Sequence, residues 1–220
     1  MKLLALETAN EQCSVCLVND DQPVFFQLDN QAKAQTRTLL PLIEQGLQQN
    51  DWQTSQLDVI AFSRGPGSFS GVRINAAVTQ ALAWANDLPV VAVSTLQALA
   101  QAAYRLQQLT QVTAVLDARM QEVYIANFVL DAHGIMQAVS EEKLLSYAAA
   151  QAEIQFTVVG SGAHLLQPEN TFGDITPTAQ DIASIAIELA KQQHWVSAEQ
   201  ALPVYLRDNA WKKIPEQGKP

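Results

Sequence analysis

The feature that most constrains the fold is an apolar, strand-like run that ends in a carboxylate and occurs twice in the chain. Residues 3–8 read LLALET and residues 113–118 read TAVLDA, so Glu7 and Asp117 occupy matching positions. In each copy a turn and a second strand-like run follow. Short apolar runs bounded by polar turn residues are typical of buried strands. The repetition predicts two related halves, each built around a central strand.

The order of elements in the first half predicts the fold class. Apolar periodicity predicts three strands and then three helices separated by two further strands. The strands are expected at residues 2–7, 13–18, 23–28, 58–62 and 89–93, and the first two helices at residues 36–49 and 71–86. The last helix is expected to begin at Ser94, which forms a capping box with Gln97. This order is that of a ribonuclease H-like half-domain, and two such halves facing across a cleft define the actin-like ATPase architecture. We therefore expect an α/β, duplicated actin-like or ribonuclease H-like fold with two subdomains.

The second half is short and diverged. Its helical material is expected over residues 141–153 and 177–194, the latter starting after Thr176. A hairpin turn is expected at residues 131–134. The boundary falls in the polar stretch 107–111. The predicted domains are residues 1–108, with the partner-binding helices, and residues 109–220.

A glycine- and serine-rich loop over residues 63–73 joins a predicted strand to a predicted helix. Backbone N–H groups converge without partners at a helix start, so such a loop can hold an anion or fit closely against another chain. No Lys-Ser or Lys-Thr follows the second glycine, which excludes a Walker A loop. A tight turn that needs positive φ would give the same pattern. The loop residues that we single out are Gly65, Pro66, Gly67, Ser68, Phe69, Gly71 and Arg73.

Charge and cysteine content limit the class of protein. The chain has 22 acidic and 13 basic side chains, a formal net charge of −9. Stand-alone nucleic-acid binders depend on cationic contacts to phosphate, so this composition argues against that class. Cys13 and Cys16 lie an odd number of positions apart on a predicted strand, which sends them to opposite faces, so we expect ordinary reduced residues. With no secretion signal or membrane span apparent, we expect a cytoplasmic protein.

Glu7 and Asp117 are the best candidates for acid–base chemistry. In the actin-like fold, carboxylates at these strand ends usually handle the metal–nucleotide and the attacking water. They could equally be turn residues that are solvated or accept backbone N–H groups. The segment 158–162 is thin for an adenine-binding loop and favours a plain strand-to-helix turn. The three histidines, His133, His164 and His194, have no ligand spacing, so we expect no catalytic residue and no metal site.

The two predicted helices at 36–49 and 71–86 are candidates for a partner-binding surface. The second is apolar around most of its circumference, so one face is expected on its own sheet and another against something else. Its alanines permit close helix approach. A helix buried within a single chain would look the same. The interface candidates are Thr36, Leu39, Leu40, Ile43, Leu47, Val72, Ile74, Val78, Ala81 and Leu82.

Several sequence islands resemble the bacterial TsaB family, which acts in tRNA threonylcarbamoyladenosine biosynthesis. The most distinctive is RGPGSFSGVR at residues 64–73. Five further islands lie in the same order, at residues 4–9, 38–41, 93–96, 117–124 and 203–207. The resemblance covers nearly the full chain.

The resemblance implies a non-catalytic subunit that pairs through its N-terminal helices with TsaD, a paralogue of the same fold. The pair would support transfer of threonylcarbamoyl to the adenosine next to the anticodon, in tRNAs reading codons that begin with A. It further implies a small ATPase partner, TsaE, a homodimer without the partner, and tRNA contact only through the complex. ATP or ADP and metal would lie on partner subunits or at the junction, with no cofactor of its own. Glu7 and Asp117 would then be vestigial cleft carboxylates.

Two other interpretations stay open at this point. The chain could be an independent actin-like ATPase, kinase or peptidase, or a ribonuclease H-like interaction module of unknown partner. Turnover by the purified chain would identify the first, and co-purification would identify a partner. The TsaB family often has a histidine near the position of Gln35, and this chain lacks it there.

Overall fold

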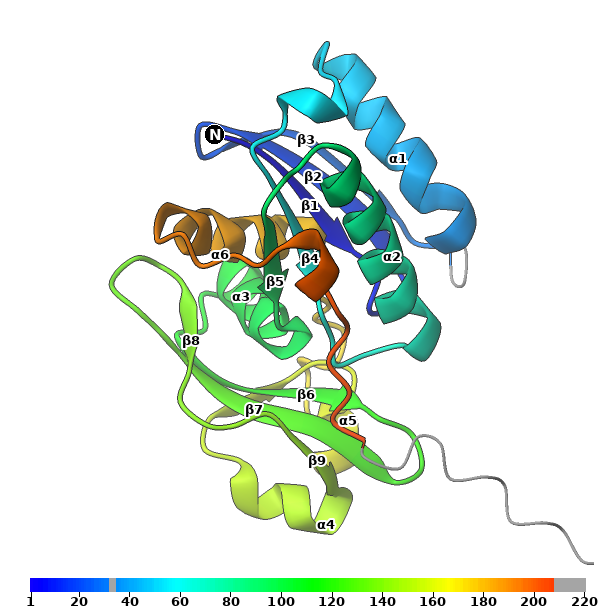
Figure 1. Ribbon diagram of the computed structural model, residues 1–220. Helices are drawn as coiled ribbons and strands as arrows, with labels where there is room; N and C mark the ends of the chain where they lie inside the picture. Colours follow the sequence, from blue (N-terminus) through cyan, green and yellow to red (C-terminus); the bar gives the residue numbers. More distant parts are fainter. Residues whose placement is uncertain (32–34, 208–220) are drawn as a thin grey trace, which may run out of the picture.

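The structure is a computed structural model that describes residues 1–31 and 35–207. Over these residues the backbone forms two lobes, each built on a five-stranded sheet (Figure 1). No helix in this part of the chain is long and apolar enough to cross a membrane.

The first sheet has the strand order β3-β2-β1-β4-β5. Its strands are β1 (Lys2–Glu7), β2 (Cys13–Asn19), β3 (Gln22–Asp29), β4 (Val59–Ser63) and β5 (Val90–Val93). Strand β1 pairs antiparallel with β2 and parallel with β4. Because side chains alternate between the faces of a strand, Leu3 and Ala5 pack on one face and Leu4 and Leu6 on the other. Both faces of this sheet are therefore buried.

The second sheet repeats the arrangement of the first on a smaller scale. Its strands are β6 (Gln111–Asp117), β7 (Glu122–Leu130), β8 (Met136–Ala138), β9 (Lys143–Ser146) and β10 (Thr157–Val159). The order is β10-β6-β7-β8, with β9 also paired to β7. Strand β6 pairs antiparallel with β7 and parallel with β10, as β1 does with β2 and β4. The duplicated actin-like, ribonuclease H-like fold class is confirmed.

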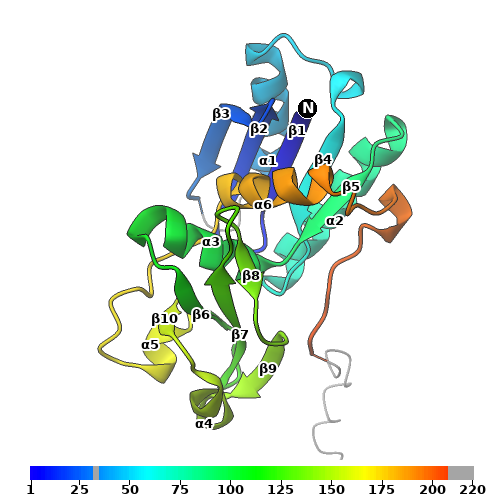
Figure 2. The same ribbon diagram turned by 90° about the vertical axis from the view of Figure 1, so that its left-hand side faces the viewer.

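Four longer helices cover the sheets. They are α1 (Gln35–Gln49), α2 (Phe69–Ala85), α3 (Thr95–Gln107) and α6 (Ala179–Lys191). Helices α1 and α2 pack on one face of the first sheet and α6 on the other (Figures 1 and 2). The short helices are α4 (Tyr147–Ala150) and α5 (Ala163–Leu166), with 3₁₀ turns at Thr54–Gln56, Gln151–Glu153 and Ala198–Gln200.

The lobes exchange helices across the predicted domain boundary. Helix α3 precedes residue 108 but packs against β6, β7 and β8 of the second sheet. Helix α6 follows it but packs against β1 and β2 of the first sheet. The two helices meet at a bidentate ion pair, in which Arg105 Nε and Nη2 lie 2.8 and 2.9 Å from the buried Asp181 carboxylate oxygens. The division into residues 1–108 and 109–220 stays a prediction.

Two helices predicted for the second half are present, but they begin later than predicted. Residues 141–146 are not helical, because β9 pairs antiparallel with β7 and places Leu144 opposite Tyr124. Only α4 and a 3₁₀ turn follow. Helix α6 begins at Ala179 rather than beside Pro177, because Thr178 and Asp181 form a reciprocal capping box there.

The predicted cap of α3 is confirmed, but the capping box is not. Ser94 Oγ accepts hydrogen bonds from the N–H groups of Leu96 and Gln97 at 3.1 and 3.2 Å. The Gln97 side chain instead donates to the carbonyl of Met136 in β8, at 2.8 Å. Packing of α3 on the second sheet offers Gln97 an acceptor that the sequence could not show.

Candidate functional site

A cavity of about 1080 Å³ lies between the lobes. The first lobe contributes the turn after β1, at residues 9–12, and the glycine loop at residues 66–70. The second lobe contributes Asp117–Arg119, Ser161 and His164. The last wall comes from the end of the described chain, through Val204, Tyr205 and Arg207. The cleft expected between two facing halves is thus present.

Glu7 ends β1 but does not line this cavity. The residue is 1% exposed, and its Oε1 accepts a hydrogen bond from the Ala9 N–H at 2.5 Å. Among the described residues, its Oε2 has no hydrogen-bond partner. The pKa of this carboxyl group is raised to about 7, mainly by burial and to a smaller extent by the charge of Asp181, while the Ala9 N–H acts to lower it. Glu7 is a buried turn residue whose surroundings favour the protonated carboxyl group.

Asp117 takes the matching place in the second lobe and does line the cavity. Its Oδ1 accepts a hydrogen bond from the Arg119 N–H at 2.8 Å. Its Oδ2 pairs with Arg119 Nη1 at 2.9 Å. Like Glu7, this carboxylate therefore closes its own turn. Of the two possibilities left open by the sequence, the geometry favours N–H-bonding turn residues at both strand ends.

The glycine loop packs against the chain's own β1–β2 turn. A Cβ on Gly67 would collide with the carbonyl of Ala9, and one on Gly71 would collide with the carbonyl of Thr8. The Ser68 N–H donates to the Ala9 carbonyl at 2.7 Å, and Ser68 Oγ caps α2 by accepting from the Gly71 N–H at 3.4 Å. These glycines are explained by close approach within the chain rather than by an anion or a second chain. Among the glycines of this loop, only Gly65 has positive φ, at 102°.

Burial divides the ten interface candidates into two groups. Leu39, Ile43, Leu47 and Val72 are 8% exposed or less and pack in the chain's own core, so their assignment to an intermolecular surface is corrected. Thr36, Leu40 and Ala81 are exposed, while Ile74, Val78 and Leu82 are half-buried. The error arose because the main apolar stripe of α1 faces the sheet, and only Leu40 lies outside it.

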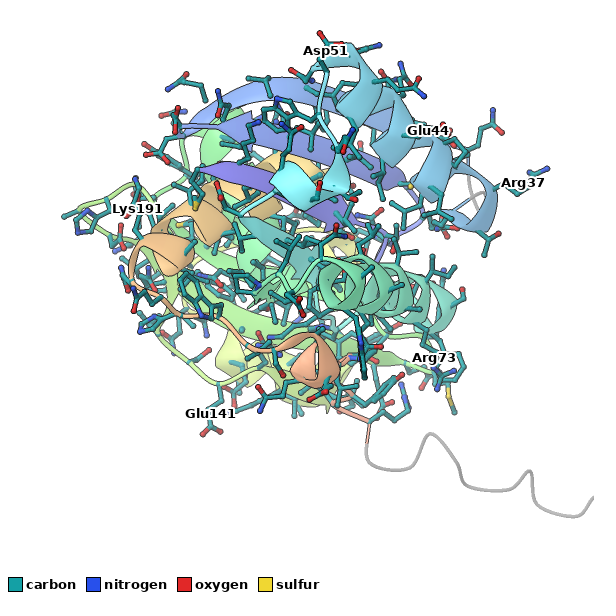
Figure 3. The ribbon with its side chains drawn as sticks, turned by 45° about the horizontal axis from the view of Figure 1, so that its top comes forward. Arg37, Glu44, Asp51, Arg73, Glu141 and Lys191 are labelled. Carbon is teal, nitrogen blue, oxygen red and sulfur yellow. The ribbon has the colours of Figure 1, made fainter. Side chains whose placement is uncertain are left out.

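The exposed side of α2 is mainly apolar, whereas that of α1 carries Leu40 and Pro41 among polar and charged side chains. Leu40 is 56% exposed, and Arg37 and Glu44, one turn away on either side, project from α1 into solvent in Figure 3. On α2, Trp84 is 65% exposed beside the exposed Ala77 and Ala81. The sequence analysis missed Trp84 as a candidate, although its helical spacing from these alanines could have revealed it. We call these four exposed residues, Leu40 on α1 and Ala77, Ala81 and Trp84 on α2, the helix face.

Asn75 is a second residue that the sequence analysis missed. It is 0% exposed on α2, and its Nδ2 donates to the Leu6 carbonyl at 3.3 Å and to Ser63 Oγ at 2.8 Å. It joins α2 to the ends of β1 and β4 behind the glycine loop. The sequence signal that could have identified Asn75 is an amide side chain within a mainly apolar helix.

Metal ligation has no support in the part of the chain that the structure describes. There, no three His, Cys, Asp or Glu side chains gather as a possible metal site. Cys13 and Cys16 are buried in different core clusters on opposite faces of the first sheet, as predicted. Residues 160–162 form the expected turn between β10 and α5.

Comparison with known proteins places the chain in a family. A family model described as TsaD, tRNA N6-adenosine threonylcarbamoyltransferase, matches residues 29–200. The tRNA threonylcarbamoyladenosine biosynthesis protein TsaB of Escherichia coli (strain K12) is 36% identical over 229 residues, covering 98% of this chain and 99% of the relative. The protein of the same name from Haemophilus influenzae is 36% identical over 231 residues, covering 98% of each.

Solved structures agree with these sequence matches. YeaZ from Pseudomonas aeruginosa superposes with a TM-score of 0.84 at 36% identity, covering 93% of this chain and 99% of that one. The likeness extends over both lobes, and so over the cleft and the helix face. The chain therefore belongs to the TsaB family, within the wider group that the TsaD model also matches.

Proposed function

We propose that this chain is a non-catalytic scaffold or activating subunit in the biosynthesis of threonylcarbamoyladenosine in tRNA. The names of its E. coli and H. influenzae relatives support the pathway. The chain supports transfer of threonylcarbamoyl to the adenosine next to the anticodon, in tRNAs reading codons that begin with A. The transfer itself takes place on a TsaD-type paralogue.

The state of the two strand-end carboxylates carries this proposal. A general base must reach the reacting atoms, but Glu7 is buried behind the cavity wall. Asp117 reaches the cavity, but both of its oxygens are engaged by Arg119. The Ala9 and Arg119 N–H groups of the two turns donate to these carboxylates within the chain. These features support a subunit that stabilises or activates a partner rather than one that reacts with substrate.

The helix face is the surface on which we place the partner. It combines an exposed leucine and tryptophan with small alanines, which let another helix approach closely. A TsaD-type paralogue and a second copy of this chain would compete for it, so the homodimer is the form without the partner. The half-buried Ile74, Val78 and Leu82 lie at its border.

The remaining assignments follow from charge and from the family. A net charge of −9 is unsuited to capturing RNA alone, so tRNA is contacted through the complex. ATP or ADP and the metal belong to the partner subunits or to their junction, and a TsaE-type small ATPase joins them. The complex is placed in the cytoplasm.

A reconstitution experiment tests the proposal. This chain, the TsaD-type partner and the TsaE-type ATPase of the same cell are assayed singly and together, with threonylcarbamoyl-adenylate, ATP and tRNA. We expect transfer only when the partner and this chain are both present. Asp117→Asn should retain the stimulation, and Leu40→Glu should lose it. Transfer by this chain alone, abolished by Asp117→Asn, would contradict the proposal and favour an independent enzyme.

A further inference from the structure

The last described segment, Ala201–Arg207, crosses from one lobe to the other as an extended chain. Figure 1 shows it in orange-red, descending from beside α2 to the second lobe. It has no regular secondary structure, yet Val204, Tyr205 and Arg207 all line the cavity between the lobes. We call this segment the strap.

The strap is anchored to the first lobe at the glycine loop. The Val204 N–H donates to the Arg64 carbonyl at 2.8 Å. The Val204 carbonyl oxygen lies 3.1 Å from the position that a Cβ on Gly65 would occupy, so the backbones of Val204 and Gly65 are in close contact.

An aromatic and cationic group at the start of α2 holds the next part of the strap. Arg73 Nε donates to the Tyr205 hydroxyl at 2.9 Å. The Arg73 guanidinium also lies over the Phe69 ring, 3.3 Å from its centroid, and 5.5 Å from that of Tyr205. Cation–π contacts of this kind add to the hydrogen bond. Tyr205 is thus fixed to the first turn of α2.

Arg207 anchors the other end of the strap to the second lobe. Its Nη1 pairs with Glu122 Oε2 at 2.6 Å, and its Nη2 donates to the Ala118 carbonyl at 3.1 Å. These contacts reach both sides of the β6–β7 turn, where Arg119, Met120 and Gln121 have φ of 62°, 57° and 62°. Three successive non-glycine residues in the left-handed region need support from their surroundings.

The lobes meet directly elsewhere, through α3 and α6. Arg105 and the buried Asp181 join those helices, which lie to the left of the strap in Figure 1. Two ion pairs also cross between the lobes, Arg64–Glu142 at 3.2 Å and Arg119–Glu11 at 3.8 Å. The strap adds a backbone connection to these, and it forms part of the cavity wall.

We propose that the strap is a latch that holds the two lobes at a fixed opening across the cleft. Release of Arg207 from the β6–β7 turn lets the cleft open about the α3–α6 contact. Since its other end is fixed to α2, the latch also links the helix face to the second lobe. This inference rests on the strap contacts and not on the proposed function.

Single-molecule FRET between the lobes tests the latch at concentrations too low for self-association. Gln48→Cys on α1 and Ala148→Cys on α4 are exposed labelling sites, and the native Cys13 and Cys16 are buried. We expect Arg207→Gln to give a longer and broader distance distribution than the parent. The matched control is Lys191→Gln, which removes a Lys191–Asp21 ion pair of 2.6 Å within the first lobe.

Charge exchange separates latch loss from misfolding. Arg207→Glu alone should open the cleft, and adding Glu122→Arg should restore the parent distance. Hydrogen exchange of the amides at residues 118–122 should be faster in Arg207→Gln by up to about fivefold, the range expected for one partly exposed ion pair. An unchanged distance in Arg207→Gln with native circular dichroism overturns the proposal, as does failure of the exchanged pair to restore the distance lost in Arg207→Glu.

Discussion

Glu7 couples protonation to folding, because its environment opposes the charged form. Its ordinary pKa is 4.5, and burial raises the pKa in the folded chain to about 7. Between these pH values the folded state binds a proton that the unfolded state has released. The stability that this group contributes is therefore fully present below about pH 4.5 and is lost as the pH rises through 7.

We predict that Glu7→Gln removes this pH dependence. The free energy of unfolding of the variant, relative to the wild type, should rise by about 2–3 kcal/mol between pH 5 and pH 8. Urea unfolding of both proteins at the two pH values measures it. Other carboxylates titrate in both proteins and cancel in the comparison. A difference between the two proteins that is the same at both pH values would show that Glu7 titrates normally.

We predict a second residue-scale effect at Gly71, where the chain's own backbone leaves no room. A Cβ there would overlap the Thr8 carbonyl, and backbone atoms cannot move aside as a side chain can. Gly71→Ala should lower the free energy of unfolding by about 1–3 kcal/mol or more. The matched control is Gly173→Ala, whose Cβ would have no neighbour closer than 3.9 Å. Equal thermal unfolding midpoints for the two variants would refute the packing account of the glycine loop.

Helix α1 offers adjacent residues with opposite surroundings, which supports an element-scale prediction. Leu40 is 56% exposed on the helix face, whereas Leu39 is 1% exposed against the first sheet. Leu40→Glu should abolish self-association and partner binding with little change in stability. Leu39→Glu buries an uncompensated charge and should cost about 4 kcal/mol. Light scattering and thermal unfolding measure the two effects. Intact association in a folded Leu40→Glu protein would mean that the helix face is not the interface.

Sequence patterns predicted the longer elements and failed on the short ones. Strands β1 to β5 and helices α1 to α3 have full periods of apolar residues, so their positions followed from local spacing. Strand β9 has only two apolar residues, Leu144 and Leu145, and their adjacent positions do not distinguish a strand from a helix, whereas the equally short β5 is apolar throughout. The apolar stripe of α6, with Ile182 and Ile185, predicted a helix, but the stripe alone does not indicate which of the two sheets the helix covers.

The candidate site was predictable in position but not in environment. The matching strand ends placed Glu7 and Asp117 correctly in the two lobes. The burial of Glu7 depends on residues far away in the sequence. One of them is Pro177, whose carbonyl accepts a hydrogen bond from the Asn10 side chain at 3.0 Å. Likewise the loop glycines were marked by their pattern, while the Thr8 and Ala9 carbonyls that require them became apparent only in the fold.

At the scale of the whole molecule, each sheet has one face covered by a helix from the other half of the sequence. Helix α6 supplies Ile182, Ile185 and Ala186 to the core cluster that contains Leu3 and Ala5 of β1. Helix α3 supplies Leu96 and Leu99 to the core of the second sheet. Each half of the chain therefore completes the core of the other, which favours unfolding as one cooperative unit.

We predict that the fragment 1–108 does not fold alone, because removal of α6 exposes one apolar face of its sheet. The full chain should show one unfolding transition, with coincident circular dichroism and tryptophan fluorescence. Fusing residues 178–193 to the fragment through a flexible linker should restore a dispersed amide NMR spectrum, whereas the same fusion with Ile182→Asp and Ile185→Asp should not. A dispersed spectrum from the unfused fragment would show that α6 is dispensable and that the first 108 residues form an autonomous domain.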